Sequence, residues 1–163
     1  MGYTQPTRGT PGTDGRDAMI ATLSLDIARP PASVYASLVD QDTWAALDPA
    51  LLEITPRGSV AVGMSGTMRR RVAGMRVANG WTVTELEPGA RVGMRLTGAG
   101  YELIETTTLE ATAGGTRATI VDTLRPTSLG GRLFVAVSGP FIRRDLRARS
   151  ERLKVLLEAT PAI

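Results

Sequence analysis

The sequence predicts an α+β fold in which an antiparallel sheet curls around one long helix near the C-terminal end. Alternating, strand-like segments separated by turn residues run from about Met64 to Leu124. A single helical pattern follows from about Leu133 to Ala159. An antiparallel sheet buries one of its faces, and this helix is the long apolar element available to cover that face. We therefore expect the sheet to wrap around the helix and to leave room for a cavity between them.

Before these hairpins, the pattern predicts one strand and two short helices. Ile20–Ile27 alternates apolar and polar residues, which is typical of a half-buried strand. Pro31 is well placed as the first residue of a helix, where the missing amide hydrogen is not needed. Asp40 or Asp42 can cap a second short helix that carries Trp44.

The first hairpin is predicted from Met64 to Leu86, with a tight turn at Gly74-Met75. That turn pairs Met68 with Trp81 across the two strands, and the resulting faces separate cleanly into apolar and polar sets. The apolar face comprises Met64, Met68, Val72, Val77, Trp81 and Val83, with Arg70, Asn79 and Glu85 as polar members.

A strand at Val92–Leu96 leads to a second hairpin, whose two-glycine turn is Gly114-Gly115. In the predicted register Glu105 lies opposite Leu124 and diagonal to Asp122. Met94 lies close to both Glu85 and Glu105 on neighbouring strands. The predicted inward side chains of this hairpin are Tyr101, Leu103, Glu105, Thr107, Leu109, Ala118, Ile120, Asp122 and Leu124.

The last helix carries an apolar stripe, and the residues Gly139-Pro140 are expected to kink or interrupt it. Its basic residues between Arg143 and Lys154 lie largely off that stripe and are expected to be solvated. The stripe comprises Phe134, Val137, Phe141, Leu146, Leu153, Leu156 and Leu157.

Composition excludes several kinds of chemistry. The 163-residue chain contains no Cys and no His, so disulfides, cysteine nucleophiles, serine–histidine hydrolysis and histidine-bound zinc are ruled out within it. We expect no metal and no cofactor. The net charge is +3, but arginines alternate with acids and aromatic residues are only 4%, which favours a solvated surface over nucleic-acid binding.

The length suits one domain, predicted at residues 18–160, after a disordered N-terminal tail at residues 1–17 that is rich in Gly, Thr and Pro. No apolar run approaches the roughly twenty residues of a membrane span. With no secretory signal either, a cytoplasmic location is expected. The sequence does not decide between a monomer and a homodimer.

Local phrases and element order together resemble the START/Bet v 1-like (SRPBCC) superfamily, and within it the polyketide cyclase/dehydrase-like family. The phrases are Ile27-Ala28-Arg29-Pro30-Pro31-Ala32-Ser33-Val34-Tyr35, Leu38-Val39-Asp40 leading to Trp44, and the ending Leu146–Glu158. The resemblance implies a helix-grip fold, with seven antiparallel strands around the last helix and an internal cavity. It also implies binding of lipids, sterols, hormones or polyketides, with cyclisation or dehydration in some members.

The candidate catalytic groups are Glu105, Asp122, Tyr101 and Arg70. A carboxyl group in an apolar cavity has a raised pKa, and two in different surroundings can divide acid and base roles. Tyr101 or Arg70 could polarise a carbonyl oxygen. The alternative is that each acid pairs with Arg70 or lies in water at the rim of the sheet.

The predicted ligand-binding residues combine apolar walls with these polar groups. They are Trp44, Met64, Met68, Arg70, Trp81, Glu85, Met94, Tyr101, Leu103, Glu105, Ile120, Asp122, Phe134, Val137 and Phe141.

Three functions are weighed. The leading hypothesis is a protein that binds a hydrophobic or polycyclic, lipid- or polyketide-like molecule in an internal cavity. The alternative is a polyketide cyclase, aromatase or dehydratase that uses cavity carboxylates as acid and base, and whether there is turnover is open. The third is a basic module that binds nucleic acid or anionic lipid, which the mixed charge pattern disfavours.

Overall fold

The computed structural model describes residues 18–72 and 75–159 of the chain. The predicted tail, residues 1–17, lies outside the described residues, and so does residue 160. The elements in chain order are β1 (Met19–Ile27), α1 (Pro31–Leu38), α2 (Gln41–Leu47), β2 (Leu51–Thr55), β3 (Ser65–Val72), β4 (Met75–Glu87), β5 (Arg91–Gly98), β6 (Tyr101–Thr112), β7 (Gly115–Pro126) and α3 (Leu129–Ala159).

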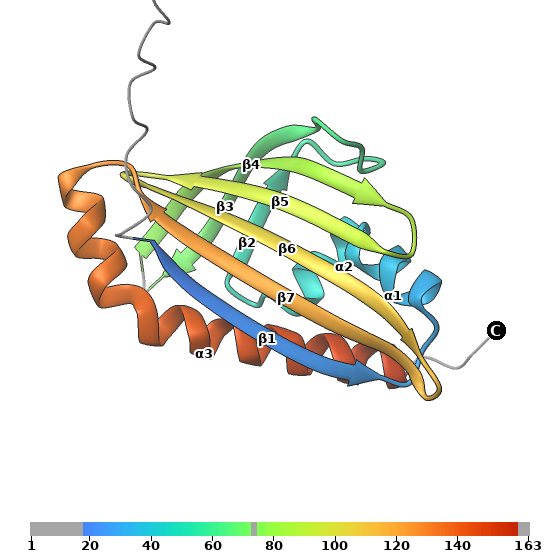
Figure 1. Cartoon of the computed structure of the whole chain (residues 1–163). Helices are drawn as coiled ribbons and strands as arrows, with labels where there is room; N and C mark the ends of the chain where they lie inside the picture. The colour runs from blue at the N-terminus through green and yellow to red at the C-terminus, as the bar shows by residue number, and fades with distance from the viewer. Residues whose placement is uncertain (1–17, 73–74, 160–163) are drawn as a thin grey trace, which may run out of the picture.

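Seven strands form one antiparallel sheet in the order β1-β7-β6-β5-β4-β3-β2. Figure 1 shows this sheet curving over α3, which runs along one side of it beneath β1 and β7. This is the helix-grip α+β fold. Residue patterning alone missed β2, because Leu51–Thr55 is short and does not alternate cleanly, yet it pairs with β3 at the edge of the sheet.

The start of the fold follows the predicted signals. Pro31 is the first residue of α1. The carboxylate of Asp40 accepts hydrogen bonds from the backbone amides of Asp42 and Thr43, which makes Asp40 the N-cap of α2. The indole of Trp44 then donates to the carbonyl oxygen of Leu38 at 2.7 Å, tying α2 to α1.

The β6–β7 hairpin has its turn one residue earlier than predicted. Its last pair is Thr112 with Gly115, and the register therefore moves by two residues. Glu105 lies directly opposite Asp122, where the sequence predicted Leu124. A two-residue shift keeps every side chain on its predicted face, so the inward set is correct and only its cross-strand neighbours change.

The same correction applies to the β3–β4 hairpin. Val72 pairs with Met75, and Met68 pairs with Asn79 rather than with Trp81. The predicted turn at Gly74-Met75 falls partly outside the described residues, but Met75 itself belongs to β4. Met68, Asn79 and Trp81 are all buried, so the predicted face is again correct.

Glu85 does not share that face, which is a correction to the predicted site. The β4–β5 pairing passes from Val83–Met94 to Glu85–Gly93, an irregularity that places one extra residue in β4. Glu85 therefore turns away from Met94, and its carboxylate accepts a hydrogen bond from Arg91 at 3.0 Å.

Only part of the predicted stripe on α3 faces the sheet. Leu146, Leu153 and Leu157 are buried, as predicted. In contrast, Phe134, Val137 and Phe141 are 42%, 60% and 69% exposed. At 100° per residue, Phe141 lies roughly 140° around the helix from Leu146, so the two side chains cannot share a face. The ring of Phe134 stacks on that of Tyr101, with centroids 4.7 Å apart.

The helix is continuous through Gly139 and Pro140. Figure 1 shows that it changes direction within its N-terminal half, which agrees with the predicted kink and not with a break.

The N-terminus of α3 is anchored to the turn between β5 and β6. Ser128 caps the helix, with its hydroxyl oxygen accepting from the amide of Gly131 at 3.0 Å. The carbonyl oxygen of Gly100 accepts from Thr127 at 2.8 Å, and it lies so close to Gly131 that a Cβ there would be 1.6 Å away. A side chain at position 131 would therefore push α3 off the sheet.

We predict opposite effects of alanine at two adjacent glycines. Gly131→Ala should lower the free energy of unfolding by about 1–3 kcal/mol, because its Cβ meets a backbone carbonyl. Gly130→Ala should raise it by about 0.4–1 kcal/mol, because the nearest atom to its Cβ is 3.9 Å away and alanine favours the helix. Urea denaturation of both variants checks this, and equal effects would contradict it.

Candidate functional site

A small pocket of about 120 Å³ lies between the inner face of the sheet, α2 and α3. One wall is apolar. It comprises Leu38, Trp44, Leu47, Leu51, Met68, Met94, Leu96, Ile120, Leu146 and Leu153. The remaining lining residues are polar or charged: Asp48, Arg70, Glu105, Thr107, Arg149 and Ser150.

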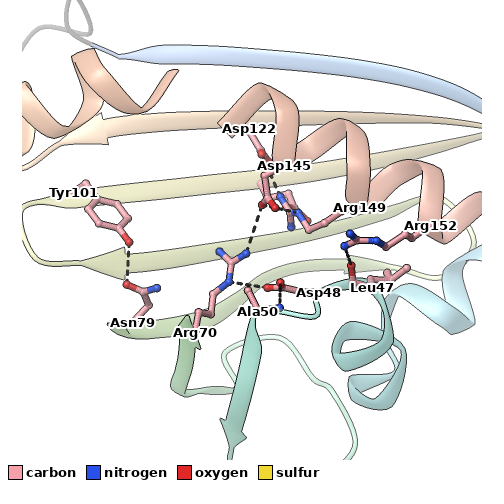
Figure 2. Close-up of polar contacts among 11 residues, drawn as sticks. Leu47, Asp48, Ala50, Arg70, Asn79, Tyr101, Asp122, Asp145, Arg149 and Arg152 are labelled. Atoms are coloured by element: carbon pink, nitrogen blue, oxygen red, sulfur yellow. Dashed lines mark hydrogen bonds and ion pairs between the residues drawn. The ribbon is translucent and has the colours of Figure 1, made fainter. Parts of the chain in front are cut away.

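Arg70 reaches the pocket because strand alternation turns it inward between two outward arginines. Its neighbour Arg69 pairs with Glu53 at the surface, at 3.0 Å. The guanidinium of Arg70 lies 2.6 Å from the carboxylate of Asp48 and 3.4 Å from that of Asp145. The other oxygen of Asp48 accepts from the amide of Ala50 at 2.9 Å, which fixes the carboxylate toward Arg70 (Figure 2).

Arg149 connects α3 to the sheet at the same end of the pocket. Its guanidinium donates to Glu105 at 3.2 Å and lies 3.5 Å from Asp122 and 3.3 Å from Asp145. Burial by itself lowers the pKa of this guanidinium, but the surrounding carboxylates outweigh that effect and raise it. Arg149 therefore stays charged and acts as the counterion of the buried acids.

Asp122 is the most deeply buried member of this charged set. Its side chain has no exposed surface, and neither of its oxygens accepts a hydrogen bond from the described residues. Burial raises its pKa to about 7, and the facing carboxylate of Glu105 adds to the increase while Arg149 opposes it. Near neutral pH, the protonated and ionised forms of Asp122 are therefore both populated.

These groups form one network of four carboxyl groups and two guanidinium groups: Asp48, Glu105, Asp122, Asp145, Arg70 and Arg149. With every carboxyl ionised, two negative charges are not compensated within it. A proton on Asp122 removes one of them. The network can donate hydrogen bonds from guanidinium groups, accept them at carboxylates, and hold or release a proton.

Six of the predicted site residues line the pocket: Trp44, Met68, Arg70, Met94, Glu105 and Ile120. Asp122 lies behind Glu105 and contacts the network through Arg149. The structure thus brings these residues together, and their role in binding stays a prediction.

The other predicted residues lie elsewhere. Trp81 is buried beside Ile54, Met68 and Val83, where its indole donates to the carbonyl oxygen of Thr55 at 3.2 Å, and Met64 packs against the same cluster. Leu103 is half-buried and does not line the pocket. Four more predicted residues do not line the pocket. The irregularity in β4 turns Glu85 away from it, and α3 leaves the side chains of Phe134, Val137 and Phe141 exposed.

Tyr101 is also separate from the acids. Its hydroxyl donates to the side-chain oxygen of Asn79 at 2.9 Å, and Figure 2 shows this pair away from Arg149 and Asp122. Burial raises the pKa of the Tyr101 hydroxyl, against the opposing effects of Arg70 and Asn79. These observations disfavour Tyr101 as the group that polarises a bound oxygen.

Sequence reasoning missed Arg149, Asp145 and Asp48. It placed Arg149 on a solvated helix face, yet the spacing contained a usable signal. Arg149 lies three residues after Leu146 and four before Leu153, so it belongs to the buried stripe. Asp145 precedes it by four residues, the spacing of a helical ion pair.

Two further findings concern the described part of the chain. No group of three or more acidic side chains there is arranged to hold a metal ion. None of its helices is both long enough and apolar enough to cross a membrane.

Comparison with known proteins gives one family and several similar folds. Residues 19–158 match the sequence model of a family described as polyketide cyclase / dehydrase and lipid transport. No curated protein shows significant sequence similarity to this chain.

Among solved structures, protein CV1439 from Chromobacterium violaceum is similar with a TM-score of 0.71 and 20% identity, covering 86% of this chain and 99% of that one. Ara h 8.0201 has a TM-score of 0.69 and 12% identity, with 88% and 99% covered. The di-domain ARO/CYC StfQ from the steffimycin biosynthetic pathway has a TM-score of 0.70 and 17% identity, with 88% of this chain and 51% of that chain covered.

The raised pKa of Asp122 predicts a specific pH dependence of stability. Between pH 4 and 7 the folded protein holds a proton on Asp122 that the unfolded chain has released, so stability falls as pH rises through this window. At pH 8 the cost approaches roughly 4 kcal/mol, at about 1.36 kcal/mol per pKa unit. Asp122→Asn should remove this dependence and be the more stable protein at pH 8, as measured by urea denaturation at pH 4.5, 6 and 8.

The control is Asp26→Asn. Arg117 lowers the pKa of the exposed Asp26, so both its folded and unfolded pKa lie below this window. Its stability difference from wild type should stay constant between pH 5 and 8. A constant difference for Asp122→Asn as well would show that Asp122 does not titrate in the folded protein.

Proposed function

Because the chain belongs to the polyketide cyclase/dehydrase and lipid transport family, we propose that it binds a hydrophobic small molecule in the pocket between the sheet and α3. The family supports a ligand-binding or polyketide cyclase role in general. The observation that carries the proposal is the composition of the pocket, where apolar walls converge on Arg70, Glu105 and Arg149 at one end. Apolar burial provides the affinity, and these polar groups orient the oxygen atoms of the ligand.

The charge of the polar end selects among ligands. Four carboxyl groups face two guanidinium groups there, so an added carboxylate meets excess negative charge. A neutral hydroxyl or carbonyl group avoids this repulsion. It can still accept from Arg70 or Arg149 and, as a hydroxyl, donate to Glu105. The favoured ligand is therefore apolar with a neutral oxygen-bearing group.

Size sets a second condition. A cavity of about 150 Å³ holds benzene, so a pocket of about 120 Å³ encloses at most one ring or a short chain. A polycyclic ligand of the kind predicted from the sequence needs about 300 Å³ or more. It would have to displace side chains of α2 or α3.

A compact phenol tests the proposal. 4-Methylphenol should bind in an NMR titration, and 4-methylbenzoate should bind at least about tenfold more weakly because of the charge repulsion. Leu96→Trp should abolish binding by filling the pocket, because Leu96 lines it. Thr97→Trp is the matched control, since the next residue of β5 is exposed on the opposite face.

Native mass spectrometry of freshly purified protein complements the titration, because a retained molecule identifies the chemical class directly. Wild-type protein that carries no ligand and does not bind 4-methylphenol would contradict the proposal. Equal binding by the Leu96→Trp variant would show that any bound phenol lies outside this pocket.

A second function, proton-transfer catalysis of cyclisation or dehydration, is favoured by the Glu105–Asp122 pair. Glu105 lines the pocket, and Asp122, opposite it on β7, has a pKa raised to about 7. Glu105 would remove a proton next to a carbonyl group, while Arg70 or Arg149 stabilises the resulting oxyanion. In dehydration, Glu105 would then return that proton to the β-hydroxyl group, which leaves as water as its C–O bond breaks and the C=C bond forms. StfQ, a fold relative described as an ARO/CYC, is consistent with this chemistry on the same scaffold.

Dehydration of 4-hydroxybutan-2-one, a β-hydroxy ketone small enough for the pocket, tests this second function. Wild type should accelerate the reaction, and Glu105→Gln should lose about 10²–10⁴ of that rate as followed by NMR. Glu110→Gln is the control, because Glu110 is an exposed acid on the same strand. If wild type is no faster than buffer at any pH between 5 and 9, the pair has no such catalytic role for this substrate class.

A further inference from the structure

The pocket is adjoined by a second hollow on the outer side of the α2–α3 contact. This groove has a volume of about 420 Å³ and is lined by Ala46, Leu47, Ala148, Glu151, Arg152, Val155 and Leu156. Leu47 lines both the groove and the inner pocket. Leu47, at the end of α2, therefore forms part of the boundary of each space.

Two polar contacts fix the backbone around Leu47. Arg152 donates from α3 to the carbonyl oxygen of Leu47 at 3.1 Å, and Asp48, the next residue, is fixed against Arg70 at 2.6 Å. Figure 2 shows both contacts on the same side of α3 as the charged network. The backbone at Leu47 is thus anchored from two directions, which leaves rotation of its side chain as the simplest way to join the spaces.

The groove is chemically suited to an apolar chain. Five of its seven lining residues are apolar, and Val155 is 68% exposed to water there. Glu151 and Arg152 supply its polar rim. Covering the apolar floor would remove Val155 from water, which is favourable at about 25 cal/mol per Å².

We propose that this groove is a second binding subsite, which holds an apolar extension of the ligand that passes Leu47 from the inner pocket. The inference rests on the proposed binding function and specifies its substrate class. The ligand is an elongated molecule with a compact, neutral, oxygen-bearing head and a linear hydrocarbon tail. The head occupies the 120 Å³ pocket at Arg70, Glu105 and Arg149, and the tail lies between α2 and α3. This arrangement accommodates a long ligand without expanding the inner pocket.

A homologous series of 4-alkylphenols, from methyl to octyl, tests the subsite. The affinity of wild type should rise by about fourfold for each methylene that enters the groove, the factor that corresponds to about 0.8 kcal/mol. Val155→Asp should weaken binding of 4-octylphenol by about tenfold or more and that of 4-methylphenol by less than about twofold.

Val62→Asp is the matched control, because Val62 is also an exposed valine, at 60%, and lines neither space. It should leave the whole series unchanged. If 4-methylphenol binds but 4-octylphenol binds no more tightly, or if Val155→Asp and Val62→Asp behave alike, the second subsite is overturned and the pocket function stands. If no member of the series binds wild type, the pocket function itself fails.

Discussion

The interior of this protein depends on the compensation of buried carboxyl groups by Arg149. Glu105 and Asp122 face each other from neighbouring strands, and an ionised carboxylate without a partner in such a position costs several kcal/mol. Arg149 contacts both acids from α3. The same guanidinium therefore compensates the negative charge of these two acids and fixes the position of α3 over the sheet.

Arg70 extends this arrangement to β3 and α2. It bridges Asp48, just after α2, and Asp145 on α3, so both helical walls are tied to β3 through one side chain. Since acids outnumber arginines, the network stays short of positive charge, and a proton on Asp122 makes up part of the difference. The same imbalance gives the polar end of the pocket its preference for neutral oxygen atoms over carboxylates. The excess of carboxyl groups over guanidinium groups therefore explains both the proton on Asp122 and the preference for a neutral ligand.

The sequence predicted sheet faces well and cross-strand neighbours poorly. Strand alternation placed Arg70, Glu105 and Asp122 inward, and all three belong to the network. The register of each hairpin differs by two residues from the predicted one, however, and that offset changes which residues face each other without changing their side of the sheet. The direct Glu105–Asp122 contact could therefore not be predicted. Glu85 was misplaced for a different reason, because an extra residue in β4 has no clear mark in the sequence.

By itself, the sequence determined the order of the elements other than β2, the helix-grip architecture, the start of α1 at Pro31, the N-cap of α2 at Asp40, and the exclusion of cysteine and histidine chemistry. These properties depend on composition and on local periodicity, which each segment carries independently of the rest. Only the tertiary structure decided that Arg149 contacts Glu105 and Asp122, that Phe141 points outward, and that Leu47 lines two hollows. Those outcomes depend on which side of α3 faces the sheet. That orientation is set by long-range packing and by charge compensation among residues far apart in the chain.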